Sequence, residues 1–254
     1  MKPKDRPRLR VSLGSLLLGF KVGVHKPKAL GDYILFGKGA SVQGQANGLA
    51  VALGWDILGL SSYWQRIKAN TKLKDYIEAK LSGVNYGQVA IPELLYVLVR
   101  KLCPKTVVET GVAAGVSSAY ILQALEDNEY GRLYSIDYPN YAMGEGQPIP
   151  KGMETGFAVP NYLLRRWNLQ IGKSETMLPA VLAVTQHVDI FLHDSEHSYD
   201  NMLREYMAAW VYLKEGGLLV SHDINETSAF REFAQIVNCK GHEIYFTNMG
   251  VIRK

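Results

Sequence analysis

The sequence predicts an α/β fold, in which a doubly wound, mostly parallel seven-stranded sheet with an antiparallel C-terminal strand pair follows an N-terminal extension. Two observations support this prediction. From residue 106 to residue 237, short β-branched runs alternate with amphipathic helical runs, which is typical of a parallel sheet with crossover helices. The last two strand-like segments are joined by a link too short for a crossover, so they must pair antiparallel.

The elements are assigned in chain order. Pro92 to Leu102 begins with a helix-initiating proline and has apolar residues at helical spacing, and Cys103-Pro104 ends it. Strands are expected at residues 106–110, 132–136, 168–171, 188–193, 217–221, 242–246 and 249–254. Helices are expected at residues 115–126, near 160–167, and at 175–184, 196–213 and 226–237. Right-handed crossovers would place these helices on both faces of the sheet.

Residues 1–85 are predicted to be an extension, and residues 86–254 a single domain. The extension carries a helical pattern from Tyr63 to Leu81. Residues 1–40 hold nine Lys/Arg and two Asp/Glu, a net charge of +7, so the remaining 214 residues carry −3 of the overall +4. Because the body is not basic, no nucleic-acid partner is expected.

The first 30 residues combine a basic start with an apolar stretch. Lys21 interrupts that stretch, no small-residue cleavage site follows, and the run is too short to span a bilayer. We therefore favour an arm that packs on the body or on a second subunit of a homo-oligomer, with peripheral membrane contact as the alternative. Cys103 and Cys239 have neither disulfide nor metal-binding spacing, which predicts a cytoplasmic protein with reduced thiols.

The most informative motif is VVETGVAAGVSS, at residues 107–118. It predicts a buried strand that carries Glu109, a tight turn at Gly111 and Gly115, and the start of a helix. The glycines allow close approach of a ligand, the helix N-terminus attracts an anion, and the acid suits a cationic amine. A zwitterionic ligand fits this turn, whereas the glycine spacing of the dinucleotide fingerprint and the Gly-Lys-Ser/Thr of the phosphate loop are absent. A βα turn without a ligand is the alternative.

Ligands of doubly wound sheets bind at the carboxyl ends of the strands. Asp137 follows the second strand, and its carboxylate suits the paired hydroxyls of a ribose. After the third strand, Ser174 is expected to cap a helix, while the backbone near Lys173 faces an adenine. A loop carboxylate without a ligand is the alternative for Asp137.

The fourth and fifth strands are followed by HDSEHSY and SHDIN. If these strands are neighbours, Asp194 and Asp223 face one pocket, with His197 one helical turn beyond Asp194. Carboxylates and an imidazole at one rim suit a hard divalent metal or proton abstraction from a hydroxyl. The alternatives are that Asp194 or Ser195 caps the long helix, that Asn225 caps the next one, and that His193 is a buried structural histidine.

Taken together, the order of these motifs resembles class I S-adenosylmethionine-dependent methyltransferases, with a Rossmann-like sheet, over residues 86–254. The H-D-S-E-H-S-Y element is similar to a small bacterial and archaeal O-methyltransferase-like group often found with polysaccharide and secondary-metabolite genes. The resemblance implies S-adenosylmethionine as the cofactor. The implied cofactor-binding residues are Glu109, Gly111, Gly115, Ser117, Asp137, Ser174 and Asp194.

Related sugar and catechol O-methyltransferases bind Mg²⁺ through an acid after the fourth strand and an Asp-Asp or Asp-Asn pair after the fifth. Asp194 matches the first position, but the pair here is His222-Asp223, and Mg²⁺ prefers oxygen ligands. Two expectations follow from the resemblance. Either Asp194, His222 and Asp223 hold Mg²⁺, or the site is metal-free and His197 is the general base, with Asp194 as the second catalytic residue.

The function expected from this resemblance is O-methylation of a small hydroxylated acceptor: a sugar, a polyketide or other secondary metabolite, or a catechol-like compound. The glycine- and proline-rich segment 139–159 is expected to be a lid over the cofactor and acceptor. A non-catalytic protein that keeps the cofactor-binding fold as an interaction platform is the alternative.

Overall fold

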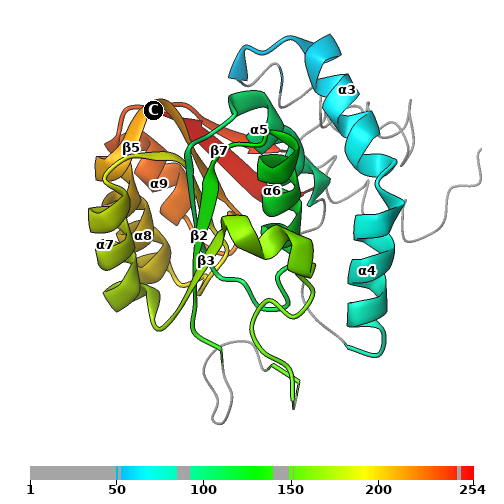
Figure 1. Cartoon of the computed structure of the whole chain (residues 1–254). Coiled ribbons are helices and arrows are strands. Elements are labelled where there is room, and N and C mark those ends of the chain that lie inside the picture. The colour runs from blue at the N-terminus through cyan, green and yellow to red at the C-terminus, as the bar shows by residue number, and fades with distance from the viewer. Residues whose placement is uncertain (1–49, 51–52, 85–91, 140–148, 151, 245–246) are drawn as a thin grey trace, which may run out of the picture.

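A computed structural model describes residues 50, 53–84, 92–139, 149–150, 152–244 and 247–254 (Figure 1). The predicted arm and the alternative membrane contact at residues 1–30 lie outside the described residues. In the part of the chain that is described, no helix is both long and apolar enough to cross a membrane.

The seven strands form one sheet in the order β3-β2-β1-β4-β5-β7-β6, which confirms the predicted fold class. Strands β1 to β5 pair in parallel, and β7 pairs antiparallel with both β5 and β6. Their bounds are β1 Thr106–Thr110, β2 Arg132–Asp137, β3 Trp167–Ile171, β4 Val188–His193, β5 Leu213–Ser221, β6 Gly241–Ile244 and β7 Met249–Arg253. Residues 245–246 of the last predicted hairpin lie outside the described residues.

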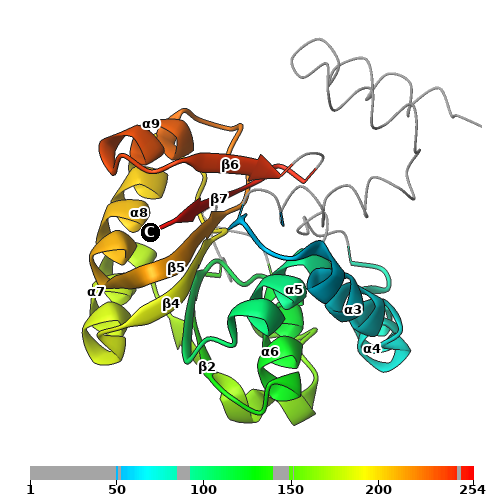
Figure 2. The ribbon, with the colours of Figure 1, turned by 90° about the horizontal axis from the view of Figure 1, so that it is seen from above.

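Helices cover both faces of the sheet (Figure 2). One face carries α7 (Ser174–Thr185), α8 (Tyr199–Tyr212) and α9 (Ala229–Ile236). The other carries α5 (Glu93–Leu102) and α6 (Val116–Asp127), with α3 (Ile57–Lys68) and α4 (Thr71–Leu81) packed outside them. A short 3₁₀ helix, η1 (Asn161–Arg166), precedes β3.

Several helix boundaries differ from the sequence prediction. Helix α9 begins at Ala229 rather than at residue 226, and α7 begins at Ser174 itself, with Lys173 rather than Ser174 at its N-cap.

Two further differences affect the N-terminal helices and the site. The pattern from Tyr63 to Leu81 is two helices, because the side chain of Asn70 accepts a hydrogen bond from Leu73 N (3.1 Å) and starts α4 there. Helix α8 begins at Tyr199 rather than at residue 196, because Ser198 Oγ caps it. His197 therefore lies in the β4–α8 loop and not one helical turn beyond Asp194.

The predicted extension contributes to the main hydrophobic core. Leu60 of α3 and Leu73 of α4 are fully buried in the same cluster as Leu98 of α5 and Leu122 of α6. This burial joins the described part of residues 53–81 to the sheet, on the face away from α8.

Candidate active site

The backbone ladder of the sheet brings the strand ends together. It continues one residue beyond three strands: Gly111 N donates to Ile136 O (2.9 Å), Asp194 N to Thr110 O (2.8 Å) and His222 N to His193 O (2.9 Å). The residues that follow β1, β4 and β5 are therefore held side by side, as the parallel order of these strands requires.

A cavity of about 1070 Å³ opens at this edge of the sheet. Most of the residues singled out from the sequence line it, together with Arg204 of α8 and with Tyr138 and Pro139 beyond β2. The predicted site residues in its lining are Gly111, Ser117, Asp137, Ser174, Asp194, His197, His222 and Asp223. Glu109 and Gly115 belong to the motif but are not in the lining.

Glu109 lies beneath the glycine turn and is fully buried. Its carboxylate accepts hydrogen bonds from the hydroxyls of Ser117 (2.6 Å), Ser118 (2.6 Å) and Ser135 (2.8 Å). Burial raises the pKa of Glu109 to about 7, although the three hydroxyl donors oppose this rise. Its position ties the start of α6 to the sheet, and its contact with the amine of a ligand stays a prediction.

At both glycines of the turn, a side chain would clash with neighbouring protein backbone. Gly111 has φ +85°, and a Cβ there would lie 2.0 Å from the carbonyl oxygen of Asp194. Gly115 has φ +89°, and a Cβ there would lie 2.8 Å from Gly156 Cα. Close approach of the β4 end and of the segment around Gly156 therefore explains both glycines without a ligand.

Asp137 is oriented by the protein toward the cavity. Its Oδ1 accepts from Val112 N (3.2 Å), and its Oδ2 accepts from the hydroxyl of Thr155 (3.0 Å). Burial raises its pKa even though these donors act in the opposite direction. Thr155 belongs to the predicted lid, so this part of the lid segment is buried against the turn; residues 140–148 and 151 lie outside the described residues.

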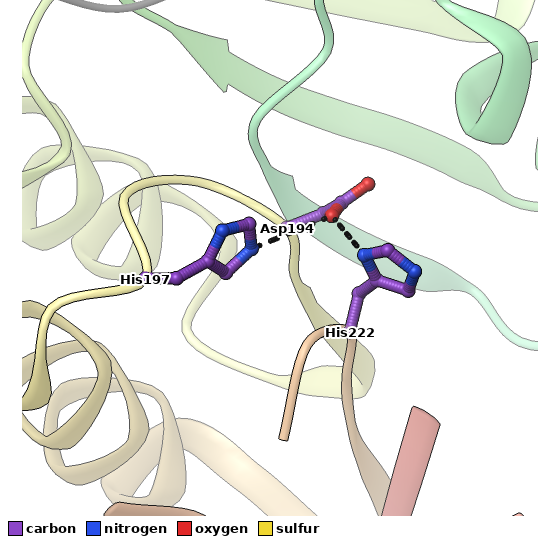
Figure 3. A group of neighbouring side chains, drawn as sticks. All are labelled: Asp194, His197 and His222. Carbon is purple, nitrogen blue, oxygen red and sulfur yellow. Dashed lines mark ion pairs between the residues drawn. The ribbon is translucent and has the colours of Figure 1, made fainter. Parts of the chain in front are cut away.

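Asp194, His197 and His222 form a compact cluster at the rim of the cavity (Figure 3). His222 Nδ1 lies 2.9 Å from Asp194 Oδ1, and His197 Nε2 lies 3.7 Å from the same oxygen. Asp223 closes the group, since its Oδ2 lies 3.3 Å from His222 Nδ1 and 3.5 Å from His197 Nδ1.

Charge is strongly coupled within this cluster. Burial alone would lower the pKa of His222, but Asp194 and Asp223 outweigh it and raise that pKa to about 10. Burial alone would raise the pKa of Asp194, yet the two histidines lower it. For Asp223, interaction with His222 is the main cause of a lowered pKa. Both carboxylates are therefore ionised at neutral pH.

A second polar group, not identified from the sequence, lies behind this rim. Glu205 of α8 is 1% exposed and accepts from Thr110 Oγ1 (2.5 Å) and Ser195 Oγ (2.8 Å), while His193 Nδ1 lies 2.7 Å from it. Burial would raise the pKa of Glu205, but its contacts, chiefly with His193, lower it. The ionised carboxylate thus anchors the loop that carries Asp194 and His197.

The signal for Glu205 was present in the sequence. Asn201 and Glu205 are polar residues four positions apart, next to the apolar stripe of α8, and both are buried. Asn201 Nδ2 donates to Ser195 Oγ (3.1 Å), while Ser198 rather than Asp194 caps the helix. No comparable signal identifies Thr155, because its partner Asp137 is 18 residues away.

The donor set does not fit the expected Mg²⁺. Mg²⁺ takes oxygen ligands in near-octahedral geometry, whereas two of the three clustered groups are imidazoles. His197 Nε2 and His222 Nδ1 are buried and form no hydrogen bond of good geometry with the described residues. The arrangement can accept a proton or bind an ion that favours nitrogen.

Part of the chain is similar to a known protein family. Residues 108–224 match the family model of a methyltransferase domain. No curated protein sequence matches the chain.

Two solved structures illustrate the structural similarity. An O-methyltransferase from Bacillus cereus in complex with S-adenosylhomocysteine is 11% identical, with a TM-score of 0.52 over 73% of this chain and 91% of that chain. A methyltransferase from Geobacter sulfurreducens is 18% identical, with a TM-score of 0.53 over 75% of this chain and 98% of that chain. At such identities the similarity shows the fold. Residues 108–224 thus resemble a methyltransferase domain, and the seven-stranded sheet has the fold of these methyltransferase structures.

Proposed function

We propose that the protein transfers a methyl group from S-adenosylmethionine to a hydroxyl of a small acceptor. The observation that carries this proposal is one continuous cavity, lined at one end by the glycine turn and Asp137 and at the other by Asp194, His197 and His222. A cofactor and an acceptor can meet in such a cavity without leaving the edge of the sheet.

The cofactor half combines three features suited to S-adenosylmethionine. The first turn of α6 lines the cavity at Val116 and Ser117 and offers backbone N–H groups to a carboxylate. Asp137 presents a carboxylate, already oriented by Thr155, to the ribose hydroxyls. Ser174 and Lys173 lie in the lining beyond β3, where we expect the adenine.

The acceptor half supplies a means of removing a proton. In the expected reaction the acceptor oxygen forms a bond to the methyl carbon as the carbon–sulfur bond breaks, and the hydroxyl proton passes to the rim. The products are S-adenosylhomocysteine and a methyl ether. The enzyme contributes mainly alignment of the two reactants and a group that accepts the proton.

The rim is also rich in acids, which bears on the acceptor class. Glu175, Glu196 and Asp200 line the cavity in addition to the carboxylates of the cluster. We therefore expect neutral hydroxylated acceptors, such as sugars or phenolic secondary metabolites, rather than polyanionic ones.

The proposal is tested by calorimetric titration with S-adenosylhomocysteine and by transfer of labelled methyl groups to a panel of sugars, catechols and polyketide-like phenols. We expect cofactor binding and transfer to at least one hydroxylated class. Cofactor binding without transfer to any acceptor would favour a cofactor-binding protein that is not an enzyme. Absence of cofactor binding would contradict the proposal.

His197→Ala is the matching variant, with the exposed His187→Ala as its control. Replacement of His197 should reduce turnover by roughly 100-fold or more, because the rim then lacks the imidazole that we expect to accept the hydroxyl proton. Binding of S-adenosylhomocysteine should change little. Wild-type turnover in His197→Ala would remove His197 from the mechanism.

A further inference from the structure

We infer that Asp194, His197 and His222 form a binding site for a divalent transition-metal ion of the zinc type, and that this site discriminates against Mg²⁺. The inference deepens the proposed function, because the ion would lie in the acceptor half of the same cavity. It rests on the chemistry and geometry of the three donors.

The first argument is the convergence of donors. One ligand atom from each of the three residues lies within 4.8 Å of the others. Two ligands at 2.0–2.2 Å from one ion in tetrahedral geometry lie roughly 3.4 Å apart. The separations of 2.9 Å from His222 Nδ1 and 3.7 Å from His197 Nε2 to Asp194 Oδ1 fall on either side of that distance.

The second argument is that the ring nitrogens facing Asp194 contact, among the described residues, only carboxylate oxygens of the cluster. His197 Nε2 and His222 Nδ1 are buried from solvent and form no hydrogen bond of good geometry there. Buried polar atoms are rarely left without a well-formed hydrogen bond, because desolvation without such a bond is costly. A bound ion would satisfy both nitrogens at once (Figure 3).

The third argument concerns Asp223, which the sequence suggested as a ligand. Its Oδ2 lies 3.5 Å from His197 Nδ1, the nitrogen that faces away from Asp194. A histidine ligand commonly directs its second nitrogen at a carboxylate, which orients the ring and raises its basicity. Asn248 Nδ2 donates to the other oxygen of Asp223 and holds it in place. The same oxygen lies 3.3 Å from His222 Nδ1, but Asp223 is not among the three residues whose ligand atoms all lie within 4.8 Å of one another, so we assign it an orienting role.

The identity of the ion follows from the donors. Two imidazoles and one carboxylate suit zinc, iron, cobalt or nickel, whereas Mg²⁺ favours an all-oxygen set. Three protein ligands would leave a fourth coordination position for a water or an acceptor hydroxyl, as catalytic zinc sites do. An ion there would lower the pKa of a hydroxyl that it contacts.

The test is calorimetric titration of the full chain, after removal of metal with a chelator, with Zn²⁺ and separately with Mg²⁺. We expect one tight Zn²⁺ site and weaker or undetectable Mg²⁺ binding. His197→Ala and His222→Ala should each weaken Zn²⁺ binding by at least roughly 100-fold, and Asp223→Asn by roughly 10-fold. Equal or tighter binding of Mg²⁺, or no Zn²⁺ binding at all, would overturn the inference.

Two further variants make the measurement specific. The double variant Cys103→Ser/His187→Ala removes exposed groups that bind zinc adventitiously, and it should bind Zn²⁺ like the wild type. His222→Asp supplies oxygen donors in place of a ring nitrogen and should shift the preference from Zn²⁺ toward Mg²⁺. Loss of Zn²⁺ binding in the double variant, or an unchanged preference in His222→Asp, would overturn the assignment.

Cofactor binding keeps this inference distinguishable from the proposed function. Each variant is titrated with S-adenosylhomocysteine without metal, and retained binding shows that the fold and the cofactor half are intact. Cofactor binding and methyl transfer without Zn²⁺ binding would overturn the metal site alone. Zn²⁺ binding without cofactor binding would support the metal site and contradict the proposed function.

Discussion

The buried acid Glu109 makes the stability of the protein depend on pH. Its carboxylate is fully buried and is held by three serine hydroxyls, and burial raises its pKa from 4.5 to about 7. The folded protein therefore binds this proton more tightly than the unfolded chain does. The stability that the protonated acid contributes is fully present below pH 4.5 and is lost as the pH rises through 7.

The pH prediction is tested with Glu109→Gln, which keeps the shape of the side chain but does not ionise. Between pH 4.5 and pH 7 the wild type should lose about 3 kcal/mol of unfolding free energy relative to the variant, at 1.36 kcal/mol for each pKa unit. Urea unfolding at pH 5, 6, 7 and 8 measures this difference. A difference that stays constant over the series would contradict the assignment.

Thr155 provides a second test at the residue scale. Its hydroxyl donates to Asp137 Oδ2 (3.0 Å), so Thr155→Val should remove one hydrogen bond that orients the acid that we propose as the ribose ligand. A loss of about 1 kcal/mol would raise the KM for S-adenosylmethionine roughly fivefold. We expect little change in kcat, because the ribose is not the reacting part of the cofactor.

The control for Thr155→Val is Thr185→Val. The hydroxyl of Thr185 bonds only to carbonyls of its own helix, and this residue does not line the cavity. The two variants should therefore differ in KM. Similar KM values would mean that Thr155 does not act through Asp137.

At the scale of elements, the turn between β1 and α6 depends on the approach of β4. Gly111 has a positive φ, and its missing Cβ leaves room for the carbonyl of Asp194. Gly152 has the same φ of +85°, but a Cβ added there would meet nothing within 4 Å among the described residues. Alanine at Gly152 would introduce backbone strain alone, whereas alanine at Gly111 would add a steric clash with the Asp194 backbone.

We expect Gly152→Ala to cost about 1–2 kcal/mol of unfolding free energy, because an L-residue is strained in a left-handed conformation. Gly111→Ala should cost clearly more, about 4 kcal/mol, because the β4 end must also move. Chemical denaturation measures both values. Equal losses of unfolding free energy in the two variants would show that the end of β4 moves aside without a measurable loss of stability.

The β4–α8 loop is a further element-scale feature. Ser198 caps α8, so the loop is free to turn back and direct His197 at Asp194, while Glu205 anchors the loop from within α8. A helix beginning at residue 196 would have placed His197 in its first turn. The cap residue therefore decides the geometry of the rim.

At the scale of the whole molecule, helices α3 and α4 belong to the hydrophobic core formed with α5, α6 and the sheet. Arg66 of α3 also pairs with Asp127 at the end of α6 (2.9 Å). This packing favours a single cooperative unit for the described residues from 53 onward, although the boundary proposed near residue 85 stays a prediction.

Leu60→Ala tests this cooperativity. Leu60 is 0% exposed, so its truncation should cost about 2–5 kcal/mol, and the loss should appear in one unfolding transition for the whole molecule. Val211→Ala, at a side chain 75% exposed, is the control and should change stability by less than about 0.5 kcal/mol. Two separate transitions, with only the first shifted in Leu60→Ala, would show that the N-terminal helices unfold independently.

The sequence alone determined the strands of the parallel sheet, its closing antiparallel pair and the residues that follow each strand. Those features depend on local periodicity and on the rule that parallel strands share one carboxyl edge. Asp137, Asp194 and Asp223 could therefore be assigned to one cavity before any contact was known.

The partners of each polar group depend on the tertiary structure. Glu109 is enclosed by three hydroxyls, Asp223 is directed at two histidines, and Glu205 anchors the β4–α8 loop from within α8. Such arrangements depend on side-chain contacts that follow no periodicity in the sequence. The strand-end residues that line the cavity were therefore foreseeable from strand order, whereas the geometry of the donors around Asp194 was not.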